Sequence, residues 1–466
     1  MRCRLALLWL SWGLAHASGA TDLVGVYEDA LKNDPQIRQA DANRLASREA
    51  RPQAWAAVLP QISATASRGR DTTDGSEGNV SFDPVAGQFI AIPAAVNIGT
   101  TTKMWSLNAR ASLFSWANWM QIRAADKQVA QAEATYQAAQ QDLILRVAQA
   151  YFNVLAAQDD LGAQQASLEA ISRQLDQANK RFDVGLIAIT DVQEAKAAHD
   201  TAAAAVIASK RALATAGDRL SEITGQTYPL LAKPGEDMPL NTPQPADESR
   251  WVEVSLDRNL SLISNRLAAD IARDNVRVAY GGHLPTLDVI ASRSHTSQDT
   301  DESIDGSRPF ALNNSLNDRQ YTLQITVPLF SGGFTQSKVR QSQYLWIAAK
   351  EAVVQSSRAT ERQARDAYLG VISGIARVQA LRQALESSET ALNATEAGYE
   401  VGTRTAVDVL NARRTLVQAQ TDYSGSRYDY ILSVIQLRLA AGNLSREDVA
   451  EINKWLAVAA PTVPAG

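Results

Sequence analysis

Two short stretches carry the side chains that could do chemistry, and both have the layout of a tight turn between helices. Residues 399–412 read YEVGTRTAVDVLNA, and residues 182–195 read FDVGLIAITDVQEA, 217 positions earlier. The later stretch holds Arg404, a multiple hydrogen-bond donor, and the earlier one holds Asp191, an acceptor. Arginine and aspartate form directional, reversible links. From spacing alone, such groups are more often ordinary polar caps of helical hairpins.

The elements that hold these turns have the periodicity of long coiled-coil helices. Apolar residues recur at intervals of seven up to the first turn, and a helix from about Trp119 to Phe182 would be ~96 Å long at ~1.5 Å per residue. A second helix returns from Val192 to a glycine cap at Gly225. The same stripes recur 217 residues later. The first long stripe comprises Ile122, Val129, Tyr136, Leu143, Val147, Val154, Leu161, Leu168, Leu175 and Phe182, and its repeat comprises Val339, Trp346, Val353, Val371, Val378, Leu385, Leu392 and Tyr399.

Each long helix is preceded by two stretches in which apolar and polar residues alternate, as in β-strands. We expect hairpin strands of about twelve residues, with polar loops at roughly 70–102 and 296–317. Aromatic residues gather where the hairpins meet the long helices, as in the girdle of a membrane barrel. They are Phe114, Trp116, Trp119, Phe330 and Phe334. Four strands cannot close a barrel, so a membrane sheet of this kind requires a dimer with eight strands or a trimer with twelve.

Charge and the start of the chain limit the class of protein. The formal net charge is −5, and no basic stripe offsets the acids, which argues against nucleic-acid binding. A basic start, a short apolar run and a small-residue cleavage site predict a secretory signal over residues 1–17, with cleavage after residue 20 as the alternative. The single cysteine, Cys3, lies within this signal, so we expect no disulfide. No later segment offers 18 consecutive apolar residues.

The repeat divides the remaining chain into consecutive regions. A helix, a hairpin and two long helices form the first repeat, 22–225, and the same series forms the second, 250–442. A proline-rich linker or strap over 226–249 joins them. A short amphipathic helix and a tail close the chain over 443–466. The pattern predicts an α+β protein.

No group of residues predicts catalysis, a cofactor or a metal site. The four histidines show no ligand spacing, and the chain has no phosphate loop, dinucleotide fingerprint or nucleophile elbow. We therefore expect that the protein is not an enzyme. Acidic residues in the predicted loop at 296–317 are interpreted as a solvated external loop, with a calcium site as the alternative. These residues are Asp299, Asp301, Glu302 and Asp305.

The chain resembles the TolC family of outer membrane efflux proteins over almost its whole mature length. The most specific stretches are 182–193, 399–410 and GHLPTLD at 282–288. The resemblance implies a homotrimer in the cell outer membrane, with a twelve-stranded transmembrane β-barrel, four strands per chain, continued by a coiled-coil helical tunnel in the periplasm. It also implies contact with outer-membrane lipid and docking to a periplasmic adaptor and an inner-membrane pump or ABC exporter. The implied function is an exit duct for multidrug efflux and type I protein secretion, without a cofactor.

The resemblance also implies roles for the polar residues of the two turns, which would close the periplasmic entrance of the tunnel. Asp191 would accept hydrogen bonds from Tyr399 and Arg404, and Thr190 would also meet Arg404. Links of this kind are reversible, which suits a latch that a partner opens.

A ring of acidic side chains at the same entrance is a further implication of the resemblance. Asp408 matches the family's constricting aspartate, and symmetry would repeat it as an anionic ring that favours cations. The family usually has a second aspartate one helical turn later, where this chain has Asn411. The ring should therefore be less negative here, and any cation block weaker.

The competing interpretation is an exported coiled-coil structural protein without a pore. Its hairpins would be small solvated sheets rather than parts of a barrel. The predicted signal, the aromatic girdle and the lack of Lys or Glu on the apolar faces of the predicted strands favour the duct.

Overall fold

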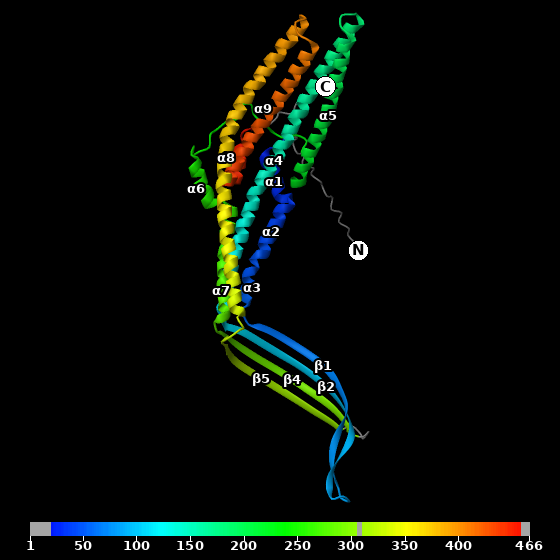
Figure 1. Ribbon diagram of the computed structural model, residues 1–466, viewed down its shortest axis with the longest axis vertical. Helices are drawn as coiled ribbons and strands as arrows, with labels where there is room; N and C mark the ends of the chain where they lie inside the picture. Colours follow the sequence, from blue (N-terminus) through cyan, green and yellow to red (C-terminus); the bar gives the residue numbers. More distant parts are fainter. Residues whose placement is uncertain (1–19, 305–309, 458–466) are drawn as a thin grey trace, which may run out of the picture. The chain divides into compact units, whose positions relative to one another are not determined.

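The computed structural model describes residues 20–304 and 310–457, which divide into two compact units (Figure 1). The first unit takes in the described parts of 1–44, 132–265 and 352–466. The second comprises 45–131 and the described parts of 266–351. No helix in the described ranges is both long and apolar enough to cross a membrane.

Four long helices confirm the periodicity of the sequence. They are α4 (Trp116–Asp183), α5 (Ile189–Thr224), α8 (Phe334–Glu400) and α9 (Ala406–Ala440). Many of the predicted stripe residues are buried, which explains why the apolar positions repeat as they do. The buried stripe residues include Leu143, Val154, Val371, Leu392, Tyr430 and Leu437.

The shorter helices are more broken than the sequence predicted. The helix expected over 22–54 is instead α1 (Leu23–Asn33), α2 (Pro35–Arg48) and α3 (Ala50–Ala56). The break before α2 has a local cause, because Asp34 precedes a proline and takes an extended backbone with ψ of 119°. Its carboxylate then caps α2 by accepting from the backbone N–H of Ile37 at 3.3 Å.

The matching helix of the second repeat is broken in the same way. Residues expected as one helix over 251–280 form α6 (Glu248–Arg258) and α7 (Leu260–Tyr280). Asn259 between them is extended, with ψ of 118°. Its side-chain oxygen accepts from the backbone N–H of Leu262 at 3.1 Å. A short 3-10 helix, η1 (Gly281–His283), follows α7.

The proline-rich segment that joins the repeats is tied to the long helices. It contains β3 (Lys233–Pro234), which pairs antiparallel with β6 (Leu456–Ala457) near the C-terminus. Buried tyrosine hydroxyls anchor it from α4 and α9. Tyr151 donates to the carbonyl of Ala232 at 2.7 Å, and the hydroxyl of Tyr430 accepts from the backbone N–H of Asn241 at 2.9 Å.

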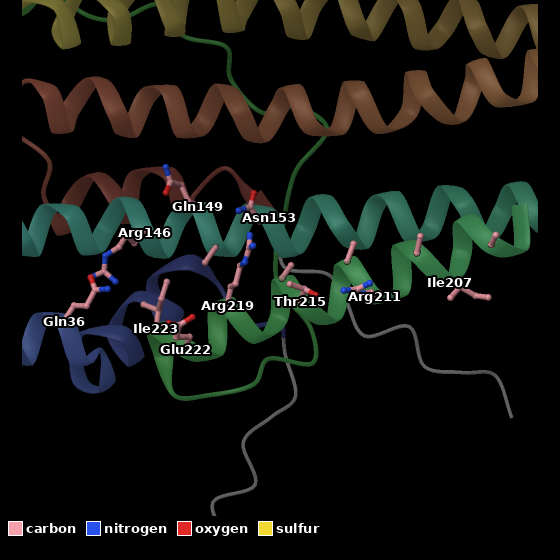
Figure 2. A pocket seen from close by; sticks show the side chains of 15 residues that line it. Gln36, Arg146, Gln149, Asn153, Ile207, Arg211, Thr215, Arg219, Glu222 and Ile223 are labelled. Atoms are coloured by element: carbon pink, nitrogen blue, oxygen red, sulfur yellow. The ribbon is translucent and has the colours of Figure 1, made fainter. Parts of the chain in front are cut away.

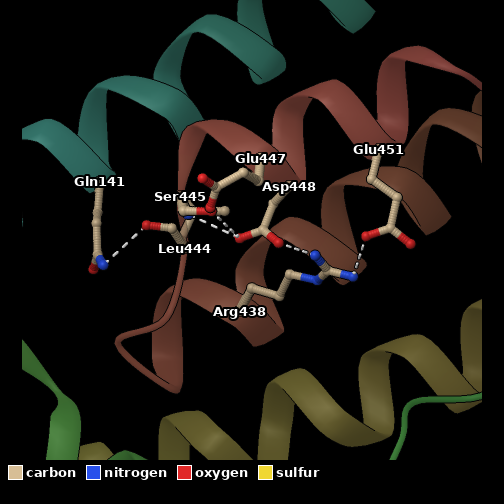
Figure 3. Close-up of polar contacts among 7 residues, drawn as sticks. All are labelled: Gln141, Arg438, Leu444, Ser445, Glu447, Asp448 and Glu451. Atoms are coloured by element: carbon tan, nitrogen blue, oxygen red, sulfur yellow. Dashed lines mark hydrogen bonds and ion pairs between the residues drawn. The ribbon is translucent and has the colours of Figure 1, made fainter.

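A polar network holds α10 (Arg446–Asn453) against α9 (Figure 3). The Arg438 guanidinium lies between the carboxylates of Asp448 and Glu451, with 2.9 Å to the second. The side-chain amide of Gln141 donates to the carbonyl of Leu444 at 3.1 Å, which ties the preceding turn to α4.

The second unit is built on a four-stranded antiparallel sheet in the order β1-β2-β4-β5 (Figure 1). The strands are β1 (Gln61–Asp83), β2 (Gln88–Phe114), β4 (Thr286–Ile304) and β5 (Phe310–Thr326). β1 and β5 form its two edges. Neither edge strand has a second partner within the described chain.

The strands correct the predicted loops and the predicted strand length. They contain 23, 27, 19 and 17 residues rather than about twelve. The loop expected over 70–102 is almost entirely strand, because β1 and β2 pair without interruption from Gln61↔Arg110 to Asp83↔Gln88. β4 and β5 likewise extend through most of 296–317. Continuous cross-strand pairing outweighs the local preference of Gly and Asp for turns.

The acidic group interpreted as a loop or a calcium site also needs correction. Asp299, Asp301 and Glu302 lie within β4, and Asp305 lies outside the described residues. The Asp299 carboxylate forms an ion pair with Lys103 on β2 at 3.0 Å. Among the residues that the structure describes, no group of three or more His, Cys, Asp or Glu side chains could hold a metal ion.

Candidate functional site

The two predicted turns share two backbone hydrogen bonds at positions 217 residues apart. The N–H of Gly185 donates to Phe182 and that of Leu186 to Arg181, at 2.8 and 2.9 Å. In the second turn, Gly402 donates to Tyr399 and Thr403 to Gly398, at 3.1 and 2.8 Å. Both central glycines have positive φ, 77° and 80°, as this type of helix C-cap requires. The two turns therefore share this form of helix C-cap. The backbone N–H of Arg404 makes a further bond to the carbonyl of Gly398 at 3.2 Å, which has no counterpart at Ile187 within the described chain.

The turn before α9 is closed by a capping box. Thr405 is the N-cap, and its hydroxyl accepts from the backbone N–H of Asp408 at 3.2 Å. The Asp408 carboxylate accepts in return from the backbone N–H and the hydroxyl of Thr405, both at 2.9 Å. The backbone bond from Thr405, followed by its hydroxyl and by the charge of Arg404, lowers the pKa of Asp408. The side chain is thus a stably ionised carboxylate with a fixed orientation.

The turn before α5 lacks such a box. Ala188 is the N-cap, and its side chain can neither accept nor donate a hydrogen bond. The carboxylate of Asp191, the third helical residue, therefore has no N-cap hydroxyl from which to accept. Within the described chain, neither Asp191 nor the adjacent exposed Thr190 has a side-chain partner. The equivalent aspartates of the two repeats therefore differ, since Asp408 is engaged within its own turn and Asp191 is free to accept from elsewhere.

The predicted donors lie in the second turn. Tyr399 is the penultimate residue of α8, and the Arg181 guanidinium lies over its ring at 5.3 Å from the centroid. Arg404 is exposed in the turn between α8 and α9. No hydrogen bond joins Asp191 or Thr190 to Tyr399 or Arg404 within the described residues of one chain. The gate formed by these four residues stays a prediction.

Asn411 lies one turn after Asp408 on α9 and is exposed. Its backbone carbonyl accepts from the hydroxyl of Thr415 at 3.0 Å, while its side-chain amide has no partner in the described chain. The amide is thus free to form hydrogen bonds with groups outside the described chain. The anionic ring at Asp408, with Asn411 beside it, also stays a prediction.

Four residues near the turns were missed from the sequence. Thr405 could have been found, because Thr-x-x-Asp before an apolar run is a capping signature. Arg181 on Tyr399, and an ion pair between Glu396 and Arg413 that joins α8 to α9 below the turn, had no sequence signal.

A groove on the first unit lies apart from the turns. It has a volume of about 1080 Å³, and Figure 2 shows that its lining comes from α4 and α5, with Gln36 from α2. Arg146 in its wall is bound by the carboxylates of Asp34 and Asp142. Arg211, Arg219 and Glu222 also line it and form no ion pair within the described chain, so the groove carries charges of both signs.

Comparisons with known proteins show which family the chain is similar to. The model of the family described as outer membrane efflux protein matches residues 26–226 and 251–443. The outer membrane protein TolC of Vibrio cholerae is 36% identical over 446 residues, 96% of each chain. TolC of Escherichia coli is 35% identical, covering 97% of this chain and 88% of its own.

A solved structure shows the same fold at lower identity. The CmeC outer membrane channel of Campylobacter jejuni is similar with a TM-score of 0.71, at 18% identity and 98% coverage of both chains. The alkaline protease secretion protein AprF of Pseudomonas aeruginosa is 28% identical over 96% of this chain and 91% of its own.

These matches confirm the predicted barrel-and-tunnel fold, the location in the outer membrane with a periplasmic tunnel, and the role of an exit duct for efflux and secretion. They give no support to the poreless structural protein. With both repeats matched and relatives above 30% identical along nearly the whole length, the chain belongs to the outer membrane efflux protein family.

Proposed function

We propose that three copies of this chain form a passive duct whose periplasmic entrance is held shut by the turns at 182–195 and 399–412. A periplasmic adaptor, with an inner-membrane pump or ABC exporter, opens it by competing for those contacts. The carrying observation is the asymmetry between the turns, because one aspartate is engaged in its own turn and the other is free.

The trimer follows from the sheet and the family together. An edge strand in lipid leaves unpaired backbone groups, each of which costs several kcal/mol, so β1 and β5 must pair with other copies. Three copies give a twelve-stranded barrel. A dimer with eight strands is the alternative on geometry, and the resemblance to the family favours three.

The latch uses the free groups. Arg404 of the second turn donates to Asp191 and Thr190, and Tyr399 donates to Asp191, with copies of the contact repeated around the entrance. An exposed pair of this kind contributes roughly 0.5–1 kcal/mol. Symmetry multiplies a small contribution into a closed state that a docking protein can still overcome.

The names of the relatives indicate a broad class of cargo. The relatives named for protease secretion and for outer membrane efflux suggest that polypeptides or small molecules pass through the duct. The proposal requires no reaction on the cargo, so the chain acts as a conduit rather than an enzyme.

Purified protein in detergent tests the assembly. Light scattering corrected for bound detergent should give about three chain masses, and the same fraction should form channels in a planar bilayer. A mass of two chains would overturn the trimer. Full recovery in buffer without detergent would overturn the duct.

A further inference from the structure

A group of basic side chains lies on the face of the sheet that also carries its apolar side chains. We call this group the basic cluster: Arg68, Arg70, Lys103, Arg293, His295 and Arg319. Side chains alternate between the two faces of a strand, so the register decides which residues share a face. The pairs Ala64↔Leu107, Leu107↔Arg293 and Arg293↔Arg319 form one row across all four strands.

Contacts between side chains confirm the shared face. The Arg293 guanidinium lies over the Trp105 ring at 5.9 Å from its centroid. The His295 ring lies 6.4 Å from the same indole. Lys103, two residues before Trp105, binds Asp299 at 3.0 Å across β2 and β4. The indole is therefore surrounded by cationic or ionisable groups.

The basic cluster places like charges next to each other, which destabilises the sheet of a single chain. Arg293 lies directly opposite Arg319, and Arg68 directly opposite Lys103. Like charges in this relation are destabilising. Of the five Lys and Arg residues, only Lys103 has an ion pair within the described chain. An anion bound between them would remove the repulsion, and arginine is well suited to bidentate binding of phosphate.

Apolar side chains cover the same face on the side toward the long helices. They are exposed by 37–67% and comprise Leu107, Leu113, Val289, Leu323 and Ile325. From Leu113 to Trp105 the strand spans eight residues, about 27 Å along its length and roughly 20 Å in height if tilted by about 40°. A membrane barrel has an apolar band about 25 Å tall. The row of Trp105 and His295 therefore lies near the level where the band ends, and Arg293 and Arg319 lie one row nearer the helices, beside Leu107. Long arginine side chains place their charged ends toward the headgroups while their stems lie on apolar surface.

The two edges of the apolar band differ. The edge toward the helices ends in exposed aromatics, Phe114, Trp116 and Trp119, with Trp119 packed edge-to-face on Trp55 at 6.0 Å. The edge toward the hairpin loops carries the basic cluster around Trp105. Because the strands continue into helices of the periplasmic tunnel at the first edge, the second edge faces the outer leaflet.

We propose that the basic cluster binds the phosphate groups of an outer-leaflet lipid whose acyl chains lie on the apolar band. Arg293 and Arg319 form the centre of the site, and the Trp105 indole packs against the lipid at headgroup level, as interfacial aromatics do. The site rests on the membrane location and is independent of the gate, so either can fail without the other.

Native mass spectrometry of the trimer in neutral detergent tests this proposal. The probes are lipid A with two phosphates, the same lipid after enzymatic removal of both phosphates, and inorganic pyrophosphate. Diphosphorylated lipid A should bind at least tenfold more tightly than the other two. Equal binding of the dephosphorylated lipid would overturn the role of phosphate, and equal binding of pyrophosphate would overturn the assignment to a lipid.

Matched variants locate the site. Arg293→Gln with Arg319→Gln should weaken binding of diphosphorylated lipid A at least tenfold. Lys210→Gln with Arg382→Gln, which removes the same charge from exposed positions on α5 and α8, should leave binding unchanged. Arg293→Lys with Arg319→Lys preserves the charge but loses the bidentate guanidinium groups, so its binding should lie between that of the unmodified protein and that of the Gln variant. Equal loss in the Lys210/Arg382 variant, or no loss in the Arg293/Arg319 Gln variant, would contradict the site.

Discussion

The Asp408 carboxylate accepts two hydrogen bonds from Thr405, from its backbone N–H and its hydroxyl, both at 2.9 Å. Its counterpart Asp191 follows Ala188 and has no such partner. One residue difference, Thr against Ala at the N-cap, therefore separates a turn that is closed on itself from one that can accept from another helix. Two turns that share two backbone hydrogen bonds therefore differ in what their aspartates can accept, as the proposed latch requires.

The capping box predicts a pH dependence of the second turn. Because the pKa of Asp408 is lowered on folding, its contribution is present above the unfolded pKa of about 4 and is lost as pH falls through the lower folded value. A nitroxide at Val401→Cys, an exposed position, should keep constant mobility from pH 8 to pH 5 and become more mobile below about pH 4.

Two variants control this measurement. Thr405→Ala removes the donor hydroxyl and should make the label more mobile at every pH, since loss of an N-cap costs about 1 kcal/mol. Asp408→Asn should abolish the change below pH 4. An unchanged pH profile in Asp408→Asn would show that another group titrates.

Restoring an aspartate at 411 should strengthen block by cations. Asn411 is exposed one turn after Asp408, so Asn411→Asp doubles the acidic groups at this level of α9 in every copy. The concentration of a trivalent cation that halves single-channel current should fall at least several-fold. Asn393→Asp, the same change at an exposed position on α8, should have no effect. If both variants respond alike, or neither responds, position 411 does not face the pore.

The segment that joins the repeats should loosen when one tyrosine hydroxyl is removed. Tyr428 on α9 donates to Asp159 at 2.6 Å, and Asp159 also binds Lys233 of β3. Burial, with the nearby charge of Asp159, raises the pKa of Tyr428, so it stays a donor at neutral pH. Tyr428→Phe should cost about 1–2 kcal/mol and speed amide exchange over 226–247 roughly tenfold.

A second tyrosine supplies the control for this variant. The hydroxyl of Tyr423 has no hydrogen bond within the described chain, and its ring packs under Arg427 at 5.7 Å. Tyr423→Phe should leave exchange over 226–247 unchanged. Equal rates in Tyr428→Phe and the unmodified protein would mean that the hydroxyl does not anchor the segment.

Gly442 should be intolerant of any side chain. Its φ is 69°, and a Cβ at this position would lie 2.2 Å from the carbonyl oxygen of Arg258. Gly442→Ala should therefore cost well over 1 kcal/mol and sharply reduce the yield of assembled protein. Gly217→Ala in α5 meets open space and should be neutral or stabilising by about 0.5–1 kcal/mol. Similar yields of the two variants would contradict the close packing at Gly442.

The long helices could be predicted because their signal is local and occurs twice. Heptad spacing up to Phe182 and its repeat up to Tyr399 predicted α4 and α8 to within a few residues. Strand length could not be predicted in this way. Residues 70–102 contain Gly and Asp that favour turns, and only pairing with the neighbouring strand, which composition does not reveal, keeps them extended.

Part of the candidate site could likewise be predicted from local sequence, and part could not. The box of Thr405 and Asp408 is readable from four adjacent residues. The relation of Asp191 to Arg404 depends on how separate helical hairpins approach each other, which no local pattern encodes. The resemblance to a family supplied that expectation, and it remains a prediction.

Single-channel conductance of Arg404→Ser in a planar bilayer tests the latch most directly. Arg404 is exposed in the second turn and is the donor common to both predicted acceptors, Thr190 and Asp191. The account predicts a clear rise in conductance over the unmodified channel, and no rise for Arg382→Ser, an exposed arginine of α8 outside the turn. Unchanged conductance in Arg404→Ser, with the trimer intact, would contradict the proposal that these turns close the entrance.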